Sequence, residues 1–147
     1  MYKLIFLDFD GVLAIKLTNN YFPQIPAIIR KLHKKYKLCI ASYNQNAINI
    51  IKKWNLEEFF CAIRCGSNTK WEGDYNYDIY SKNLSKAEQI IDMLNNELLE
   101  LEIDQENCIF FDDDKNNIKL VNDKLPKIKT IKINGNEGLL EKNINFG

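Results

Sequence analysis

The stretch "KLIFLDFDGVL", residues 3–13, places two aspartates, Asp8 and Asp10, directly after a run of apolar side chains. The apolar run 3–7 has the composition of a short strand that is buried on both faces, as in a parallel sheet. Two carboxylates about 5 Å apart repel each other by roughly 3 kcal/mol at an effective dielectric constant near 20. A buried strand that ends in two like charges therefore predicts a cation or another group that offsets this repulsion.

The composition is that of an ordinary globular domain, with 147 residues, 46% hydrophobic and 27% charged. This length is typical of one domain with a core of its own, so we predict a single domain over residues 1–147. Basic and acidic residues number 20 each, and the formal net charge is zero. This balance argues against the broad positive surface of a non-specific nucleic-acid binder, although a local basic patch remains compatible with it.

The cysteines do not have the spacing of a metal framework, because the pair Cys61 and Cys65 has no second close pair and the chain has one histidine. Cys39 and Cys108 lie in apolar runs, which is typical of reduced, buried thiols. The N-terminus lacks the basic and apolar regions of a signal peptide, and no apolar run is as long as a membrane span. We expect reduced cysteines, a cytoplasmic location and no membrane partner.

Strand-like and helix-like patterns alternate along the rest of the chain. Ser85 and Glu88 have the spacing of a capping box at the start of one helix. This alternation predicts an α/β fold with three α/β/α layers and a mostly parallel, five-stranded sheet. The expected strands are 3–7, 37–42, 61–64, 107–111 and 127–133, and the expected helices are 23–36, 45–54, 85–101 and one through 118–121.

Residues 65–83 form the least regular segment, which combines Gly, Asn and Asp with Trp71, Tyr75, Tyr77 and Tyr80. A long loop in a compact domain is more often functional than idle. We predict that this loop faces a substrate, with a simple cover over a hydrophobic edge as the alternative.

Polar residues follow three of the predicted strands. Asp8 follows the first strand, Ser42 ends the second, and Asp112 and Asp113 follow the fourth. Ligand sites of doubly wound sheets lie beyond the carboxyl ends of the strands, so we expect these side chains to converge. Because oxygen-only ligands suit Mg²⁺, the sequence predicts a magnesium ion in this acidic pocket.

A lysine at the start of the helix before the fourth strand completes the predicted site. Lys86 is the candidate, and Lys82 is its rival four residues earlier. An ammonium group, a serine hydroxyl and a metal ion together suit a phosphoryl group. Each of these residues also has a structural reading: aspartate favours turns, serine and aspartate cap helices, and a helical lysine is usually solvated.

At this point the sequence resembles the haloacid dehalogenase superfamily of phosphohydrolases along its whole length. "LDFDGVL" is similar to the first motif of that superfamily, "CIAS" to the second, "LSK" to the third and "IFFDDDKNNI" to the fourth. The fourth motif, with Asn117 downstream, is most similar to that of the small magnesium-dependent phosphatases.

The resemblance implies a role for each motif residue. Asp8 would be the nucleophile that forms an aspartyl-phosphate, and Asp10 would be the general acid and then the base. Ser42 would bind phosphoryl oxygens, and Lys86 would screen the charge of the intermediate. A second acid at Asp10 is the pattern of the phosphatases of the superfamily and favours phosphoryl transfer over dehalogenation.

For the metal, the resemblance implies ligation by Asp8 and Asp112, together with the backbone carbonyl of Asp10. Asp113 would either bind the ion through water or orient Lys86. Gly11 would permit the tight exit of the backbone after the first motif.

The resemblance also implies that the cap domain is missing. Residues 11–41 separate the first two motifs, and a predicted helix and strand already occupy much of this segment. An open site suits phosphorylated substrates carried on large molecules, although small substrates also fit. Two alternatives to a phosphatase stay open: a non-catalytic phosphate-binding module of the same fold, and a receiver-like phosphoacceptor domain. The receiver is disfavoured because the lysine here precedes the terminal acid pair.

Overall fold

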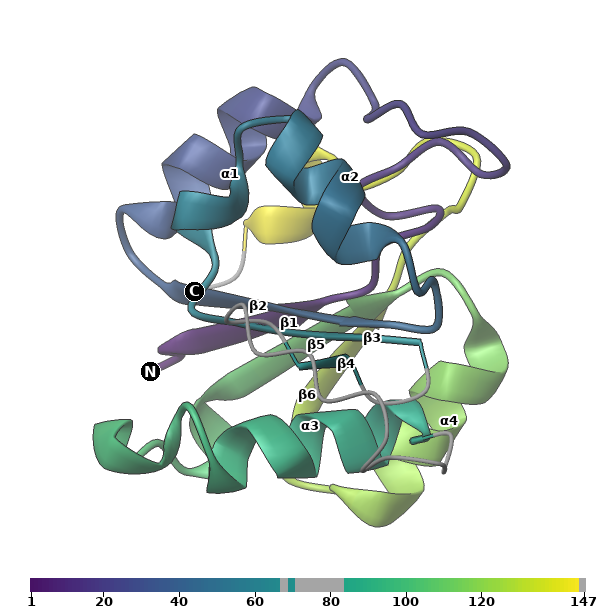
Figure 1. The fold of residues 1–147 in the computed structure, drawn as a ribbon. Helices are drawn as coiled ribbons and strands as arrows, with labels where there is room; N and C mark the ends of the chain where they lie inside the picture. Colours follow the sequence, from purple (N-terminus) through teal and green to yellow (C-terminus); the bar gives the residue numbers. More distant parts are fainter. Residues whose placement is uncertain (67–68, 71–83, 146–147) are drawn as a thin grey trace.

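The computed structural model describes residues 1–66, 69–70 and 84–145. The chain forms one sheet between two layers of helices, with α1 and α2 on one face and α3 and α4 on the other (Figure 1). The strands are β1 (Leu4–Leu7), β2 (Lys37–Ser42), β3 (Ala62–Cys65), β4 (Thr69–Lys70), β5 (Cys108–Asp112) and β6 (Lys129–Lys132). The helices are α1 (Ile25–His33), α2 (Ala47–Lys53), α3 (Lys86–Asn95) and α4 (Lys115–Lys124).

The sheet order is β4-β3-β2-β1-β5-β6, and every neighbouring pair is parallel except β3 with β4. The predicted three-layer α/β/α fold and its five parallel strands are confirmed. The structure adds a sixth strand, the two-residue β4, which lies in the segment expected to be a loop. Such a short antiparallel edge strand has too few residues for a visible pattern in the sequence.

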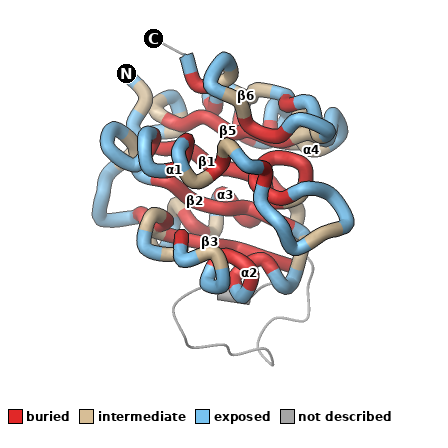
Figure 2. Tube along the Cα trace, turned by 90° about the horizontal axis from the view of Figure 1, so that it is seen from above, coloured by how far each residue is buried: buried red, intermediate tan, exposed pale blue. Residues whose placement is uncertain are grey.

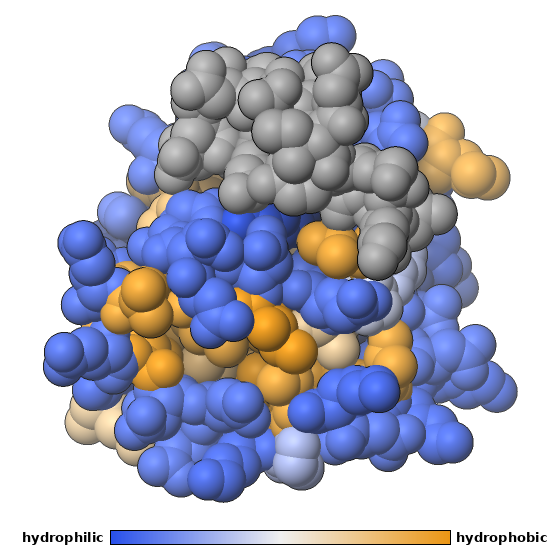
Figure 3. Space-filling view, turned by 60° about the horizontal axis from the view of Figure 1, so that its bottom comes forward, coloured by the Kyte–Doolittle hydropathy of each residue, from blue (hydrophilic) through white to orange (hydrophobic). Residues whose placement is uncertain are grey.

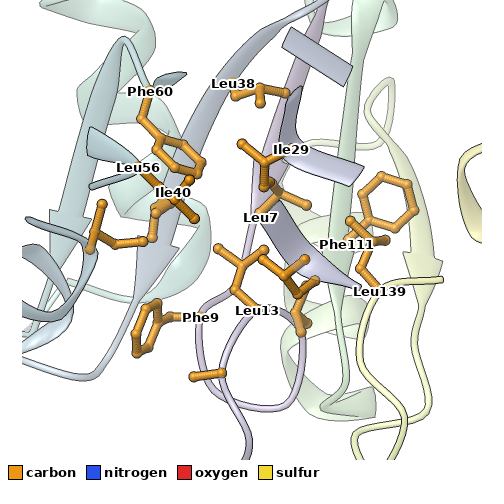
Figure 4. Packing of buried hydrophobic residues seen from close by; sticks show 14 of the residues in the cluster. Leu7, Phe9, Leu13, Ile29, Leu38, Ile40, Leu56, Phe60, Phe111 and Leu139 are labelled. Atoms are coloured by element: carbon orange, nitrogen blue, oxygen red, sulfur yellow. The ribbon is translucent and has the colours of Figure 1, made fainter. Parts of the chain in front are cut away.

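The central strand β1 shows why the sheet is buried on both faces. All four of its side chains have no solvent exposure. Successive side chains of a strand point to opposite faces, so Ile5 and Leu7 join the core under α1 and α2, whereas Leu4 and Phe6 join the core under α3 and α4. The buried strands form a continuous central layer (Figure 2), and Figure 4 shows Leu7 packed in the first of the two cores.

Helix α3 differs from the prediction at its end. The capping box of Ser85 and Glu88 is present, but the helix stops at Asn95 instead of reaching residue 101. Asn95 and Asn96 have low helix propensity, and Asn96 leaves the helical conformation with φ −123° and ψ −94°. Leu98 still reaches the core, but Leu101, the last residue of the expected helix, is 43% exposed.

The α3–α4 face of the molecule has apolar side chains among polar ones (Figure 3), and both helices contribute partly buried leucine or isoleucine to it. Single apolar residues of this kind are normal on protein surfaces. No helix among the described residues combines the length and the apolar character that crossing a bilayer requires.

The segments between the motifs hold no additional domain among the described residues. Residues 11–41 contain a turn, α1 and part of β2, as expected for a protein without a cap. The C-terminal segment, which has only a weak sequence pattern, returns to the core: Leu139 is fully buried and donates its N–H to the carbonyl of Val12 at 2.9 Å.

Candidate active site

The carboxyl ends of three adjacent strands meet at one edge of the sheet. β1 lies between β2 and β5, so the residues that follow these strands are neighbours although they are far apart in the sequence. An open hollow of about 660 Å³ lies there, and Asp112 is fully buried beside it. The other predicted site residues line the hollow: Asp8, Asp10, Ser42, Lys86 and Asp113.

Three carboxylates gather at this edge. Asp8, Asp112 and Asp113 each present one oxygen, and these oxygens lie within 4.8 Å of one another. Burial is the largest cause that raises the pKa of Asp8 well above its ordinary value, and Lys86 opposes this while Asp112 adds to it. A hard divalent cation would relieve both the desolvation and the repulsion, and the donor set consists of oxygen alone, so the residues fit Mg²⁺.

Lys86 is the cation that the fold itself places among these acids. Its side chain is 1% exposed, and its Nζ donates to Asp8 Oδ1 at 2.5 Å and to the carbonyl of Ala41 at 2.7 Å. Asp112 Oδ2 lies 3.4 Å from the same nitrogen. Burial alone would lower the pKa of Lys86, but Asp8 and Asp112 together raise it, so the ammonium form is retained.

The start of α3 explains how Lys86 reaches this position. Ser85 caps the helix through the N–H of Glu88, and Lys86 is the first helical residue. The backbone N–H of Lys86 donates to the Tyr43 hydroxyl at 3.0 Å, and the Tyr43 ring centroid lies 4.9 Å from Nζ. Lys82, the rival candidate, lies outside the described residues, as do Trp71, Tyr75, Tyr77 and Tyr80 of the expected substrate loop.

Asp10 lies in a less buried position than Asp8. Burial raises its pKa, and a long hydrogen bond of 3.4 Å from the Asn44 side chain to Asp10 Oδ1 opposes this. A raised pKa keeps more of a carboxyl group protonated and therefore suits a general acid. Gly11 follows with φ +80°, which confirms the tight exit expected there.

Ser42 is buried and lines the hollow. Its Oγ accepts the N–H of Asn44 at 3.0 Å, and its carbonyl accepts a hydrogen bond from Gln89 Nε2 at 2.9 Å. The reading of Ser42 as a helix cap is wrong, because α2 begins at Ala47 with Asn46 as its N-cap. Among the described residues, no acceptor for the hydroxyl hydrogen of Ser42 is found, so this hydrogen suits a bound ligand.

Asp112 is the last residue of β5, Asp113 and Asp114 follow it, and each of the three has its own partners. Asp114 caps α4 by accepting the N–H of Asn116, whereas Asp112 accepts the N–H of Asp114 at 2.9 Å and the Asn117 amide at 3.1 Å. Asp113 pairs with Lys16 at 2.8 Å. In the described part of the chain, the carboxylates within 4 Å of Lys86 are those of Asp8 and Asp112, so the expected role of Asp113 in orienting Lys86 has no direct contact to support it.

The structure adds residues that the sequence reasoning missed. Tyr43 and Asn44 directly follow Ser42, and this adjacency was a usable signal. Gln89 lies one turn after Lys86 on the same helix, where helical spacing points it toward the same end of the sheet. Lys16 lies in a loop without any periodic pattern, so no signal in the sequence indicated it.

Comparisons with known proteins show the fold. No protein-family model matches the chain, and no curated protein matches it either. A haloacid dehalogenase-like hydrolase from Streptococcus pneumoniae superposes with a TM-score of 0.65 at 15% identity, covering 98% of this chain and 90% of that one.

Two further solved structures are similar at equally low identity. β-Phosphoglucomutase from Clostridium difficile has a TM-score of 0.59 at 14% identity and covers 97% of this chain and 95% of that one. The N-terminal part of a Bacteroides fragilis protein, which contains a phosphatase domain and was solved with Mg, has a TM-score of 0.62 at 14% identity. It covers 94% of this chain and 38% of that one. The chain therefore has the haloacid dehalogenase-like fold that its motifs resemble.

Proposed function

We propose that the protein is a Mg²⁺-dependent phosphomonoester hydrolase that works through an aspartyl-phosphate on Asp8. The observation that carries this proposal is the convergence of oxygens from Asp8, Asp112 and Asp113 within 4.8 Å, with Lys86 bonded to Asp8. Three motifs that lie far apart in the sequence supply these groups, which a merely structural cluster would not require.

In the first step, the Asp8 carboxylate, whose charge Lys86 and a bound Mg²⁺ would stabilise against the effect of burial, attacks phosphorus, and the bond from phosphorus to the leaving oxygen breaks. Asp10, whose raised pKa favours the protonated form, gives its proton to that oxygen. Ser42 donates its hydroxyl hydrogen to the phosphoryl group, and Lys86 balances charge beside Asp8.

In the second step, water attacks phosphorus, Asp10 takes the proton of that water, and Asp8 leaves as a carboxylate. Asp8, Asp112 and Asp113, with the Asp10 carbonyl, would hold Mg²⁺, which when bound supplies positive charge that stabilises the phosphoryl group. Asp10 gives the proton in the first step and takes one in the second, so both half-reactions balance with water as the second reactant.

The hollow is open, which supports substrates that are small or that form part of a larger molecule. The neutral charge of the chain gives no reason to prefer a nucleic acid. A panel of phosphorylated peptides, sugars and nucleotides would therefore identify the substrate class once turnover is established.

The first experiment measures hydrolysis of p-nitrophenyl phosphate with Mg²⁺, with EDTA, and with Mg²⁺ restored. We expect turnover only with the metal, and a loss on the order of 10⁴-fold or more in Asp8→Asn, because this residue forms the covalent intermediate. Asp92→Asn is the matched control: Asp92 also pairs with a buried cation, Arg64, but does not line the hollow.

A rate that is unchanged by EDTA or by Asp8→Asn would refute the proposal. An Asp8 phosphate that accumulates without turnover would instead identify a phosphoacceptor domain.

A further inference from the structure

Lys16 is a second cation at the hollow, and the reaction described above does not use it. Its Nζ lies 2.8 Å from Asp113 Oδ2, and its side chain is 51% exposed. Among the described residues that line the hollow, Lys16 and Lys86 are the two lysines. Lys86 is fully buried among its partners, whereas Lys16 is accessible to a ligand.

Two glycines make room for the Lys16–Asp113 pair. A Cβ on Gly11 would lie 2.5 Å from Asp113 Oδ2 and 2.9 Å from Lys16 Cε. A Cβ on Gly135 would lie 2.5 Å from the same oxygen and 2.7 Å from Lys16 Nζ. A side chain at either position would make the ends of Lys16 and Asp113 shift, so the pair as it stands occupies space that the two glycines leave open.

The turn that carries Lys16 is braced from within. The N–H of Ile15 donates to the carbonyl of Asn20 at 2.9 Å, and the Thr18 hydroxyl donates to the carbonyl of Ile15 at 2.8 Å. Trp54 Nε1 donates to the carbonyl of Asn19 at 3.0 Å, which ties the turn to the end of α2. Leu17, with φ +64°, is fully exposed beside Lys16 at the hollow. The turn thus presents Lys16 and Leu17 at the hollow from a backbone that these hydrogen bonds hold in place.

We propose that Lys16 binds a second anionic group on the substrate, carried by the leaving group; this inference rests on the proposed hydrolase function. Asp8, Ser42 and Lys86 already serve the phosphoryl group at the buried end of the hollow. Lys16 lines the same hollow and its side chain is 51% exposed, so its ammonium is the lysine charge that the part of a substrate outside this buried end can reach. The substrate class is a phosphomonoester with a nearby carboxylate or second phosphate.

The test measures binding, so it does not depend on turnover. Isothermal titration in Mg²⁺ compares 3-phosphonopropionate with propylphosphonate, which share the phosphonate and the three-carbon chain and differ in the carboxylate. We expect the wild-type protein to bind the carboxylated ligand about tenfold more tightly, the size of one charge-assisted contact of about 1.4 kcal/mol. Lys16→Met should remove this preference, and Lys16→Arg should retain it.

Lys31→Met is the matched control, because Lys31 is 60% exposed and pairs with Glu141 at 2.8 Å but does not line the hollow. The Lys31→Met variant should prefer the carboxylated ligand as strongly as the wild type does. Gly135→Ala should reduce the preference by displacing Lys16 without changing its charge, and melting temperatures would verify that each variant is folded.

Three outcomes of the comparison would overturn the inference. They are no preference for the carboxylated ligand in the wild type, a preference that survives Lys16→Met, or an equal loss of affinity for both ligands in Lys16→Met. The last result would mean that Lys16 only neutralises Asp113. Failure to bind either phosphonate would also refute it. A Lys16-dependent preference in a protein that hydrolyses no phosphomonoester would instead refute the hydrolase proposal alone.

Discussion

Arg64 and Lys86 are both buried cations that pair with acids, but they differ in how they bind these acids. Each is 1% exposed, and each has two carboxylate partners within 4 Å: Asp92 and Glu97 for Arg64, and Asp8 and Asp112 for Lys86. Arg64 joins β3 to α3 and the turn that follows it, outside the hollow that Asp8 and Lys86 line.

The difference between the two clusters lies in how fully the cation satisfies its acids. The forked guanidinium of Arg64 binds Asp92 through one nitrogen and Glu97 through the other two, and a fork of this kind suits a permanent ion pair. Lys86 is a single point charge beside Asp8 and Asp112, whereas Asp113, whose oxygen lies within 4.8 Å of theirs, pairs with the half-exposed Lys16. A lysine has no planar fork that binds the oxygens of an acid in pairs, so these three carboxylate oxygens lie close together at an open hollow, where a metal ion would bind them.

The largest expected effects come from removing each cation. Lys86→Met should lower activity by about 10²–10³-fold, because a charge next to the reacting group is lost. Arg64→Met should instead lower the free energy of unfolding by about 3 kcal/mol, because two carboxylates lose their partner. Kinetic assays and urea unfolding of both variants measure these effects.

The metal should distinguish the two variants further. Lys86→Met should also lower the free energy of unfolding, because Asp8 and Asp112 lose their cation. Mg²⁺ should recover part of this loss and none of the loss in Arg64→Met, because the ion supplies charge to the Lys86 cluster only. Equal recovery in both variants would contradict the distinction between the clusters.

Metal binding to the wild-type protein should give an intermediate effect. At a Mg²⁺ concentration about ten times the dissociation constant, binding adds about 1.4 kcal/mol to the free energy of unfolding, or a few degrees in melting temperature. Asp112→Asn should abolish this shift, and Glu97→Gln, the corresponding change in the Arg64 cluster, should leave it intact. Differential scanning fluorimetry with and without EDTA measures the shift.

The smallest effect concerns pH in the absence of metal. The pKa of Asp8 is raised by burial in the folded state, so the folded protein binds more protons than the unfolded one above the ordinary value of 3.8. Stability due to Asp8 therefore falls as pH rises from that value through the folded-state pKa. Asp8→Asn should remove this fall and melt higher than the wild type at neutral pH.

The control for this measurement is Asp92→Asn, which should melt lower than the wild type because Arg64 loses a partner. Melting temperatures measured in EDTA over a pH series test both the expected rise for Asp8→Asn and the expected fall for Asp92→Asn. An Asp8→Asn protein that is less stable than the wild type at neutral pH would show that the Asp8 charge is net favourable.

The sequence predicted the parts of this molecule that depend on local pattern. The apolar run of β1, the capping box of Ser85 and the acids after β5 each combine a residue type with a spacing, and the structure contains each of these local features. Because the strands are parallel, their carboxyl ends had to meet, so the convergence of Asp8, Ser42 and Asp112 followed from the fold class.

Contacts between distant loops were not predictable in this way. Lys16 meets Asp113 because the turn 15–20 is tied to Trp54 and because Gly135 leaves space beside it. Neither cause produces a periodic signal. The buried ion pairs of Arg64 were missed for a related reason: an arginine in a strand looks solvated until a helix from another part of the chain covers it.

The return of the C-terminal segment to the first loop has a consequence for biosynthesis. Leu139 lies in the same core as Leu13 and bonds to Val12, and Gly135 lies against the Lys16–Asp113 pair. The ribosome makes the aspartates of the first loop well before Gly135 and Leu139, so their surroundings are complete only after residue 139 has emerged. A nascent chain would therefore expose acidic and apolar groups of the unfinished hollow until this C-terminal segment has emerged, and chaperones would meet it in that form.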